Sequence, residues 1–357
     1  MTGPVELAGY PSGSLQPDTL YISHLDDGSV GIYNAAVNGL LETGVIAAQT
    51  GTTNTVLTDL NNDGVPDAMV LNVLDEQLEV YQSSSNGGYS LSGTLPLNAE
   101  GIVQVDEPLN GYRYRGLLLE SVADDSATVV LRAQSAILRI QVQSTSPRFS
   151  VLSRTPVNGG IRFIQSADFD GDGDNDIVAA VNNSAGTEDL FIFRLDDDGL
   201  ALQNTIRVDT DFEGNFARGV AINDFDADGR MDIALLTFSN AVRIYGGDGS
   251  LSFTLLSTST PFPPGVVQGF DAGDIDGNGS LDLAALHEDQ NGLKLFVLCG
   301  NQPLRYTERL LMQVQPFVLQ GQQYHLRLLD LDRDNDLDIV FIRSFFDDVV
   351  TIENLAR

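Results

Sequence analysis

A nine-residue acidic segment occurs five times in this chain, and its recurrence limits the possible folds more than any other feature. Each copy reads D-x-[DN]-x-[DN]-[GN]-x-x-D and is followed at once by a short apolar run. The copies occupy residues 59–67, 168–176, 224–232, 274–282 and 330–338. The last four begin 56, 50 and 56 residues apart, and a gap of 109 separates the first two. Such spacing is typical of repeated supersecondary units.

Two weaker copies complete the series. Residues 120–128 keep the flanking pattern and precede the apolar run 129–131, although the acidic positions have decayed. A more altered copy covers 10–18 and precedes the run 19–23. Seven units of roughly fifty residues then fill a single domain, 1–357. Their expected boundaries are 1–50, 51–100, 101–152, 153–208, 209–258, 259–314 and 315–357.

Within each unit the hydrophobic pattern predicts strands. A continuously apolar run such as 177–181 follows the acidic segment, and an alternating run such as 190–194 comes next. A turn rich in Gly, Asp or Asn leads to a more polar stretch such as 200–208, which suits an outer strand. We therefore expect an all-β fold, a seven-bladed β-propeller with four strands per blade. A β-solenoid would have shorter coils, and a β-sandwich would not repeat the acidic loop.

The pattern leaves the closure of the ring open. Only three strands fit into the last unit before Arg357. Residues 5–8 supply either the fourth strand of this last blade or the first strand of the first blade.

The acidic segments have the composition of a cation site. Carboxylates at positions 1, 3 and 5 of a tight loop point to one side, and the position 9 carboxylate returns from the next strand. Gly at position 6, or Asn335 in the last copy, permits the positive φ that such a turn needs. An all-oxygen cage suits calcium better than magnesium, which requires a strict octahedron. An EF-hand loop needs an acidic residue at position 12. That position is apolar in every copy: Val70, Ala179, Leu235, Ala285 and Phe341.

The order of acidic loop, apolar strand, alternating strand and the turn 246–250 resembles the FG-GAP/VCBS repeat family. This family includes the N-terminal propeller of integrin α-subunits and many bacterial surface proteins. The resemblance covers nearly the whole chain and is closer to the bacterial type, because the integrin-type signatures are poorly kept. It implies about five calcium ions, each bound between the first and second strands of a blade on the lower face.

The resemblance also implies the ligands. Its side-chain ligands are Asp59, Asn61, Asp63 and Asp67; Asp168, Asp170, Asp172 and Asp176; Asp224, Asp226, Asp228 and Asp232; Asp274, Asp276, Asn278 and Asp282; and Asp330, Asp332, Asp334 and Asp338. Its backbone carbonyl ligands are Val65, Asp174, Arg230, Ser280 and Asp336. The third blade offers Glu120, Val122 and Thr128, and the first offers Tyr10, Ser12 and Ser14. We expect no calcium in these two blades.

Charge and composition narrow the function further. Nineteen basic and 50 acidic residues give a net charge of −31, which disfavours nucleic acids and anionic membranes as partners. Five calcium ions would change it to about −21 (−31 + 10) and stabilise the folded state by linkage. No apolar run is long enough for a membrane helix, and the start lacks the features of a signal peptide. Cys299 is the single cysteine, which excludes an internal disulfide.

The calcium loops nevertheless favour an extracellular or periplasmic location, because low free calcium inside a cell would leave them partly empty. Loops on the opposite face of the ring carry aromatic residues that are typical of interface anchors. The alternative is that these aromatics fill the gaps between blades. The expected partner-binding residues are Tyr112, Arg113, Tyr114, Phe212, Phe216, Phe262, Phe345 and Phe346.

No metalloprotease, nucleophile-elbow or phosphate-loop motif occurs in the sequence. We therefore expect a non-catalytic recognition or adhesion module that binds a protein or glycan partner, alone or as part of a larger surface assembly. The alternative is a carbohydrate-active propeller, either a lectin or a polysaccharide lyase. The absence of Trp weakens the glycan hypothesis, and the small number of His, Lys and Arg weakens the lyase hypothesis. A purely structural spacer is a third possibility.

Overall fold

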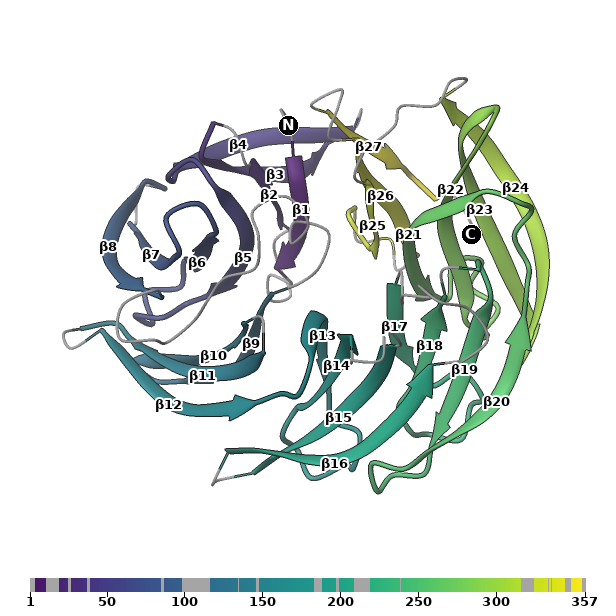
Figure 1. Ribbon diagram of the computed structural model, residues 1–357. Coiled ribbons are helices and arrows are strands. Elements are labelled where there is room, and N and C mark those ends of the chain that lie inside the picture. The colour runs from purple at the N-terminus through teal and green to yellow at the C-terminus, as the bar shows by residue number, and fades with distance from the viewer. Residues whose placement is uncertain are drawn as a thin grey trace.

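The computed structural model describes residues 4–10, 19–24, 27–36, 39–84, 87–97, 116–133, 135–145, 148–182, 188–196, 199–208, 219–237, 239–315, 324–332, 334, 336–343 and 348–354. The secondary structure in these ranges consists of antiparallel β-sheets, seven in number, set around a central axis (Figure 1). The predicted seven-bladed β-propeller is confirmed. Within the same ranges, no helix has the length and apolarity that crossing a membrane requires.

The first four blades follow the chain in order. Blade 1 contains β1 (Pro4–Tyr10), β2 (Thr19–His24), β3 (Ser29–Ala36) and β4 (Gly39–Ala47). Blade 2 contains β5 (Thr52–Thr58), β6 (Asp67–Asn72), β7 (Gln77–Ser83) and β8 (Tyr89–Pro96). Blade 3 contains β9 (Leu117–Ala123), β10 (Ser126–Arg132), β11 (Ala136–Gln143) and β12 (Phe149–Pro156). Blade 4 contains β13 (Gly160–Ala167), β14 (Asp176–Asn182), β15 (Glu188–Asp196) and β16 (Gly199–Val208).

The last three blades continue the pattern. Blade 5 contains β17 (Gly219–Asn223), β18 (Asp232–Leu236), β19 (Val242–Gly247) and β20 (Phe253–Ser259). Blade 6 contains β21 (Val266–Gly273), β22 (Asp282–Asp289), β23 (Gly292–Gln302) and β24 (Arg305–Gln315). In the described residues blade 7 contains β25 (Tyr324–Leu329), β26 (Asp338–Arg343) and β27 (Asp348–Ile352).

The hydrophobic core lies between the blades. Among the described residues, buried apolar side chains form seven clusters, one between each pair of neighbouring sheets. The second strand of blade 4 shows why these strands are apolar on both faces. Ile177 and Ala179 pack toward blade 3, whereas Val178 and Ala180 pack toward blade 5. A strand covered on both faces has no exposed side that would favour polar residues.

The ring closes between blades 7 and 1 without exchanging a strand in the described residues. β1 pairs with β2 as the first strand of blade 1, which settles the alternative that the sequence left open. β1 also lies beside β25 and β26 (Figure 1). Leu20 and Ile22 of blade 1 share a cluster with Val340 and Ile342 of blade 7. Packing of side chains therefore joins the first and last blades.

Candidate metal-binding site

The five acidic segments occupy equivalent places in blades 2, 4, 5, 6 and 7. Each connects the first strand of its blade to the second. Because strand direction alternates in the same order in every blade, all five segments lie on one face of the ring. Positions are numbered below from the first residue of each segment.

The position 9 aspartate is the most uniform member of the segment. It opens the second strand and exposes at most 1% of its surface. In blade 5, Asp232 Oδ2 accepts the N–H of Phe225 at 2.8 Å, and Oδ1 accepts the N–H of Gly247 at 2.9 Å. The other four blades repeat both bonds with Asp67, Asp176, Asp282 and Asp338. Position 9 therefore fixes the loop to the third strand, a structural role that the sequence analysis missed.

Burial raises the pKa of every position 9 carboxyl, and the two backbone N–H groups lower it in part. Burial raises the pKa of Asp176 to about 6, and repulsion from the carboxylates of Asp170 and Asp172 adds to this effect. A cation beside these groups would favour their ionised form.

The position 1 aspartate holds the turn together. Asp224 Oδ1 accepts the N–H of Asp228 at 3.0 Å, and Oδ2 accepts the N–H of Gly229 at 2.8 Å. The loops that begin at Asp59 and Asp274 have the same two bonds. In blade 4, Asp168 accepts the N–H groups of Gly171 and Gly173. The position 1 side chain is thus oriented by the loop's own backbone.

Two positions in each of these four loops have left-handed backbone. The glycines at position 6 have φ between 82° and 97°, as the sequence predicted: Gly64, Gly173, Gly229 and Gly279. Position 4 also has positive φ, between 56° and 76°, in Asn62, Gly171, Ala227 and Gly277. Asn and Gly tolerate positive φ, so their presence at position 4 of three loops could have predicted this backbone conformation. Ala227 at the same position of blade 5 breaks the pattern.

Position 2 anchors each loop in the core. Its side chain is apolar in every copy and at most 8% exposed: Leu60, Phe169, Phe225, Ile275 and Leu331. Phe169 packs edge-to-face on Phe253 of the next blade, with 5.3 Å between ring centroids. The regular apolar residue at position 2 could have revealed this anchor in the sequence.

The structure brings many of the expected ligands together. In three loops, carboxylate oxygens of three aspartates lie within 4.8 Å of one another. These groups are Asp168, Asp170 and Asp176; Asp224, Asp226 and Asp232; and Asp330, Asp332 and Asp334. In blade 2 the Asn61 amide donates to Asp63, and in blade 6 the Asn278 amide donates to the carbonyl of Gly300. The expected carbonyl ligand Val65 accepts a bond from the Ser83 hydroxyl at 3.2 Å.

Asp336 provides a direct test of whether a cation suits these loops. Its side chain is only 9% exposed, and neither carboxylate oxygen has a hydrogen-bond donor among the described residues. Burial and the neighbouring carboxylate of Asp334 raise its pKa to about 6. A buried carboxylate without donors is costly unless a cation or a proton compensates it. The donor set of blade 7 therefore fits a hard cation, and Asp336 offers side-chain oxygens as well as the carbonyl expected from the sequence.

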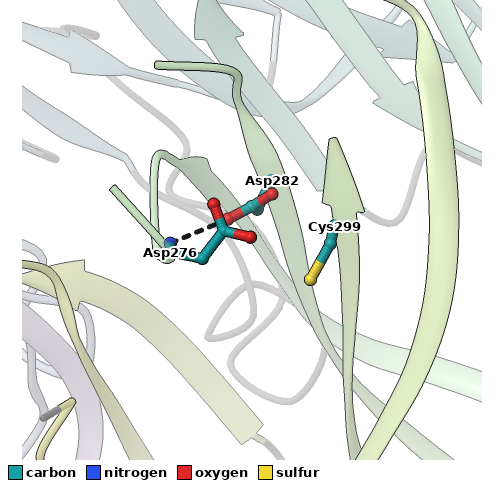
Figure 2. A group of neighbouring side chains, drawn as sticks. All are labelled: Asp276, Asp282 and Cys299. Atoms are coloured by element: carbon teal, nitrogen blue, oxygen red, sulfur yellow. Dashed lines mark hydrogen bonds between the residues drawn. The ribbon is translucent and has the colours of Figure 1, made fainter. Parts of the chain in front are cut away.

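In blade 6, the sulfur of Cys299 lies beside the acidic loop. Figure 2 shows Cys299 of β23 beside Asp276 and Asp282, whose ligand atoms lie within 4.8 Å of its Sγ. The backbone N–H of Asp276 donates to Asp282 Oδ2 at 3.2 Å (Figure 2). Cys299 lies 17 residues beyond the acidic segment in the chain, and only the pairing of β22 with β23 brings it beside Asp282.

Blade 3 has no acidic loop. Asp124 and Asp125 form a short turn between β9 and β10, and the decayed position 1 residue Glu120 pairs with Arg139 of β11. The two guanidinium bonds measure 2.8 and 2.6 Å. Of the residues expected at the corresponding place in blade 1, Tyr10 ends β1, and Ser12 and Ser14 lie outside the described residues.

One expected partner-binding residue is described, and it is buried. Phe262 is 7% exposed and packs edge-to-face on Phe296 between blades 5 and 6. It therefore belongs to the core, which corrects its assignment to an exposed surface. The other expected residues lie outside the described ranges: Tyr112, Arg113, Tyr114, Phe212, Phe216, Phe345 and Phe346.

Comparison with known proteins agrees with this architecture. Residues 168–235 and 224–285 match the family model of the FG-GAP-like repeat. No curated protein matches the chain. Two crystal structures of BBS1N in complex with ARL6DN, soaked with lead and with mercury, are similar at a TM-score of 0.64 and at 13% and 12% identity. The similarity covers 100% of this chain and 93% of theirs.

A protein from Lactobacillus plantarum is similar at a TM-score of 0.55 and 14% identity, over 87% of this chain and 84% of the other. Such low identities establish the fold alone. The chain is thus a seven-bladed β-propeller in which residues 168–285 match the FG-GAP-like repeat.

Proposed function

We propose that this chain is a calcium-stabilised, non-catalytic recognition module that binds a protein partner through the face opposite the acidic loops. The observation that carries the calcium proposal is the convergence of carboxylates in three loops, built on a scaffold that five blades repeat. In blades 4 and 5, hydrogen bonds from backbone N–H groups hold the carboxylates at positions 1 and 9 in place.

The residues present suit calcium for chemical reasons. Carboxylate, amide and carbonyl oxygens are hard donors, which calcium accepts in flexible geometry. The side chains at positions 1, 3, 5 and 9 would hold it, together with Asp336 in blade 7. Calcium, when bound, would neutralise carboxylates that otherwise repel one another across each loop. Extracellular or periplasmic calcium levels would fill such loops, so we place the protein in one of these compartments.

Protein recognition is favoured by topology and by similarity. Connections from the fourth strand of one blade to the first strand of the next begin and end on the face away from the acidic loops. The predicted aromatic residues at 112, 114, 212 and 216 belong to these connections. The similar BBS1N structures contain a protein partner, which favours a protein over a glycan.

Thermal unfolding tests the calcium proposal. The chelated chain should unfold at a clearly lower temperature than the chain in millimolar calcium, and magnesium should restore little of the difference. Changing Asp226 and Asp228 to Asn should reduce the calcium effect. The matched control changes Asp124 and Asp125 to Asn in blade 3, which should leave the effect intact. Equal melting temperatures with and without calcium would contradict the proposal.

Recognition and catalysis can be separated by two further assays. Once a partner is identified, Tyr112→Ala and Tyr114→Ala should weaken its binding while calcium-dependent melting stays unchanged. New unsaturated ends formed from anionic polysaccharides would instead indicate a lyase and overturn the non-catalytic proposal.

A further inference from the structure

The residue that faces position 9 from the third strand differs in chemistry from blade to blade. The register pairs Ile177 with Phe193, so the next pair toward the loop is Asp176 and Arg194. The same counting applies to the other acidic loops. The facing residues are Gln82 in blade 2, Arg194 in blade 4, Gly246 in blade 5, Cys299 in blade 6 and Glu353 in blade 7. This position therefore differs in chemistry among otherwise similar loops.

Arg194 places its guanidinium on two of the expected ligands. Its NH2 group donates to Asp172 Oδ2 at 2.8 Å, and its Nε forms an ion pair with Asp170 Oδ2 at 3.1 Å. Asp170 belongs to the converging carboxylate group of this loop. The guanidinium therefore takes up oxygens at positions 3 and 5 that a metal ion would need.

Blade 5 is a natural comparison, because its loop has the same four side-chain ligands. Gly246 stands where blade 4 has Arg194, so the position that faces Asp232 supplies no cation to the loop. In blade 5, Arg230 belongs to the loop itself and pairs with Asp228 at 3.2 Å. Arg230 thus engages one carboxylate, whereas Arg194 bridges two.

We propose that Arg194 is an internal competitor for the cation, which weakens calcium binding in blade 4 relative to blade 5. This inference rests on the proposed function, since it needs calcium in the loops. The charge of the ligands alone predicts the opposite order of calcium affinity, because the blade 4 loop has five aspartates and the blade 5 loop has four. Calcium binding must displace the guanidinium from both carboxylates and overcome its repulsion.

The competitor has a second consequence for the metal-free protein. Without calcium, Arg194 neutralises part of the negative charge of the blade 4 loop. The connection between β13 and β14 therefore keeps a partner for its carboxylates when calcium is scarce. The Arg194 side chain is 43% exposed, which leaves room for it to swing away when calcium binds. As the calcium concentration rises, the site in blade 4 should therefore fill after the site in blade 5.

Nuclear magnetic resonance of the full chain labelled with ¹⁵N-glycine resolves the two sites. The amides of Gly173 and Gly229 each bond to the position 1 aspartate of their own loop, so each reports its own site. In a calcium titration, we expect the midpoint for Gly173 to lie about tenfold above that for Gly229, which equals about 1.4 kcal/mol. Arg194→Gln should lower the Gly173 midpoint by about tenfold and leave Gly229 unchanged.

Two variants sharpen this test. Gln is the natural residue of blade 2 at this place, so R194Q should fold, and its melting temperature without calcium checks that it does. Arg194→Lys keeps the positive charge but loses the simultaneous contact with Asp170 and Asp172. The Gly173 midpoint should then lie between those of the unchanged chain and R194Q. Arg230→Gln is the matched control and should shift the Gly229 midpoint by less than about threefold, as expected for an exposed pair.

The outcomes are distinguishable. If Gly173 and Gly229 titrate together, and R194Q shifts Gly173 less than about twofold, Arg194 does not compete and the calcium sites stand. An equal effect of R230Q at its own site would also overturn the inference, because contact with two carboxylates would then be irrelevant. If neither amide responds up to about 10 mM calcium, above the range of weak extracellular sites, the proposed function fails as well.

Discussion

Blades 3 and 5 fix the connection between their first two strands by different chemistry. In blade 5, residues 224–231 form an acidic loop, and Asp232 links it to the third strand through backbone N–H groups. In blade 3, a short turn replaces the loop, and Glu120 on β9 reaches across to Arg139 on β11. Both arrangements tie the first half of a blade to its third strand.

The difference shows what the acidic loop adds. Blade 3 carries its own cation in Arg139, with 13% of that side chain and 4% of Glu120 exposed. Blade 5 gathers Asp224, Asp226 and Asp232, whereas the guanidinium of its own Arg230 pairs with Asp228 instead. Under the proposed function, a bound calcium ion would compensate the three converging carboxylates. We therefore expect blade 3 to be independent of calcium and blade 5 to depend on it.

The largest loss of stability should follow from removal of the position 9 aspartate. Asp232→Ala leaves the N–H groups of Phe225, Asp226 and Gly247 without their acceptor in a buried place. We expect a loss of about 3–5 kcal/mol in the free energy of unfolding, measured by urea titration in chelator.

Asp228→Ala in the same loop is the control for this change. Its carboxylate is exposed and pairs with Arg230, so without calcium the loss should stay below about 1 kcal/mol. Equal losses for the two variants would contradict the structural role of position 9.

The ion pair of blade 3 should have the next largest effect. Glu120→Ala leaves the largely buried guanidinium of Arg139 without its partner, and should cost about 2 kcal/mol. A double-mutant cycle with Arg139→Met measures the coupling between the two side chains. The rise in melting temperature caused by calcium should be unchanged in E120A, and a reduced rise would break the contrast between the blades.

The smallest effect concerns the left-handed residue of blade 5. Ala227 has φ of 63°, which is unfavourable for a residue with a Cβ. Ala227→Gly should therefore stabilise the protein by about 0.5–1 kcal/mol in urea unfolding. In the reverse change, Gly171→Ala in blade 4, the added Cβ has no atom within 4 Å. The positive φ alone should therefore lower the free energy of unfolding by about 1 kcal/mol. A gain from G171A would contradict this interpretation.

The sequence was sufficient to predict the ring. The spacing of the acidic segments gave the number of blades, and the run 129–131 identified blade 3 although its loop had decayed. The apolar runs 177–181, 233–236 and 339–342 lie within β14, β18 and β26. These predictions succeed because period and strand pattern are local properties of the chain.

Contacts between strands were not predictable in the same way. Which residue faces position 9 depends on the register of the second and third strands, so the roles of Arg194 and Cys299 could not be read from spacing. The pair Glu120–Arg139 likewise joins strands that are not adjacent in the sheet. Asp336 was expected to contribute its carbonyl, because sequence spacing does not show that its side chain is buried.

The most direct test of the account is a count of the calcium ions bound to the purified chain. Gel filtration in calcium buffer followed by elemental mass spectrometry should give about five ions per chain, one for each acidic segment. The count should fall by one when Asp226 and Asp228 are changed to Asn, and stay the same when Asp124 and Asp125 are changed. Less than about one ion per chain, with all three proteins alike, would contradict the central claim that these loops are calcium sites.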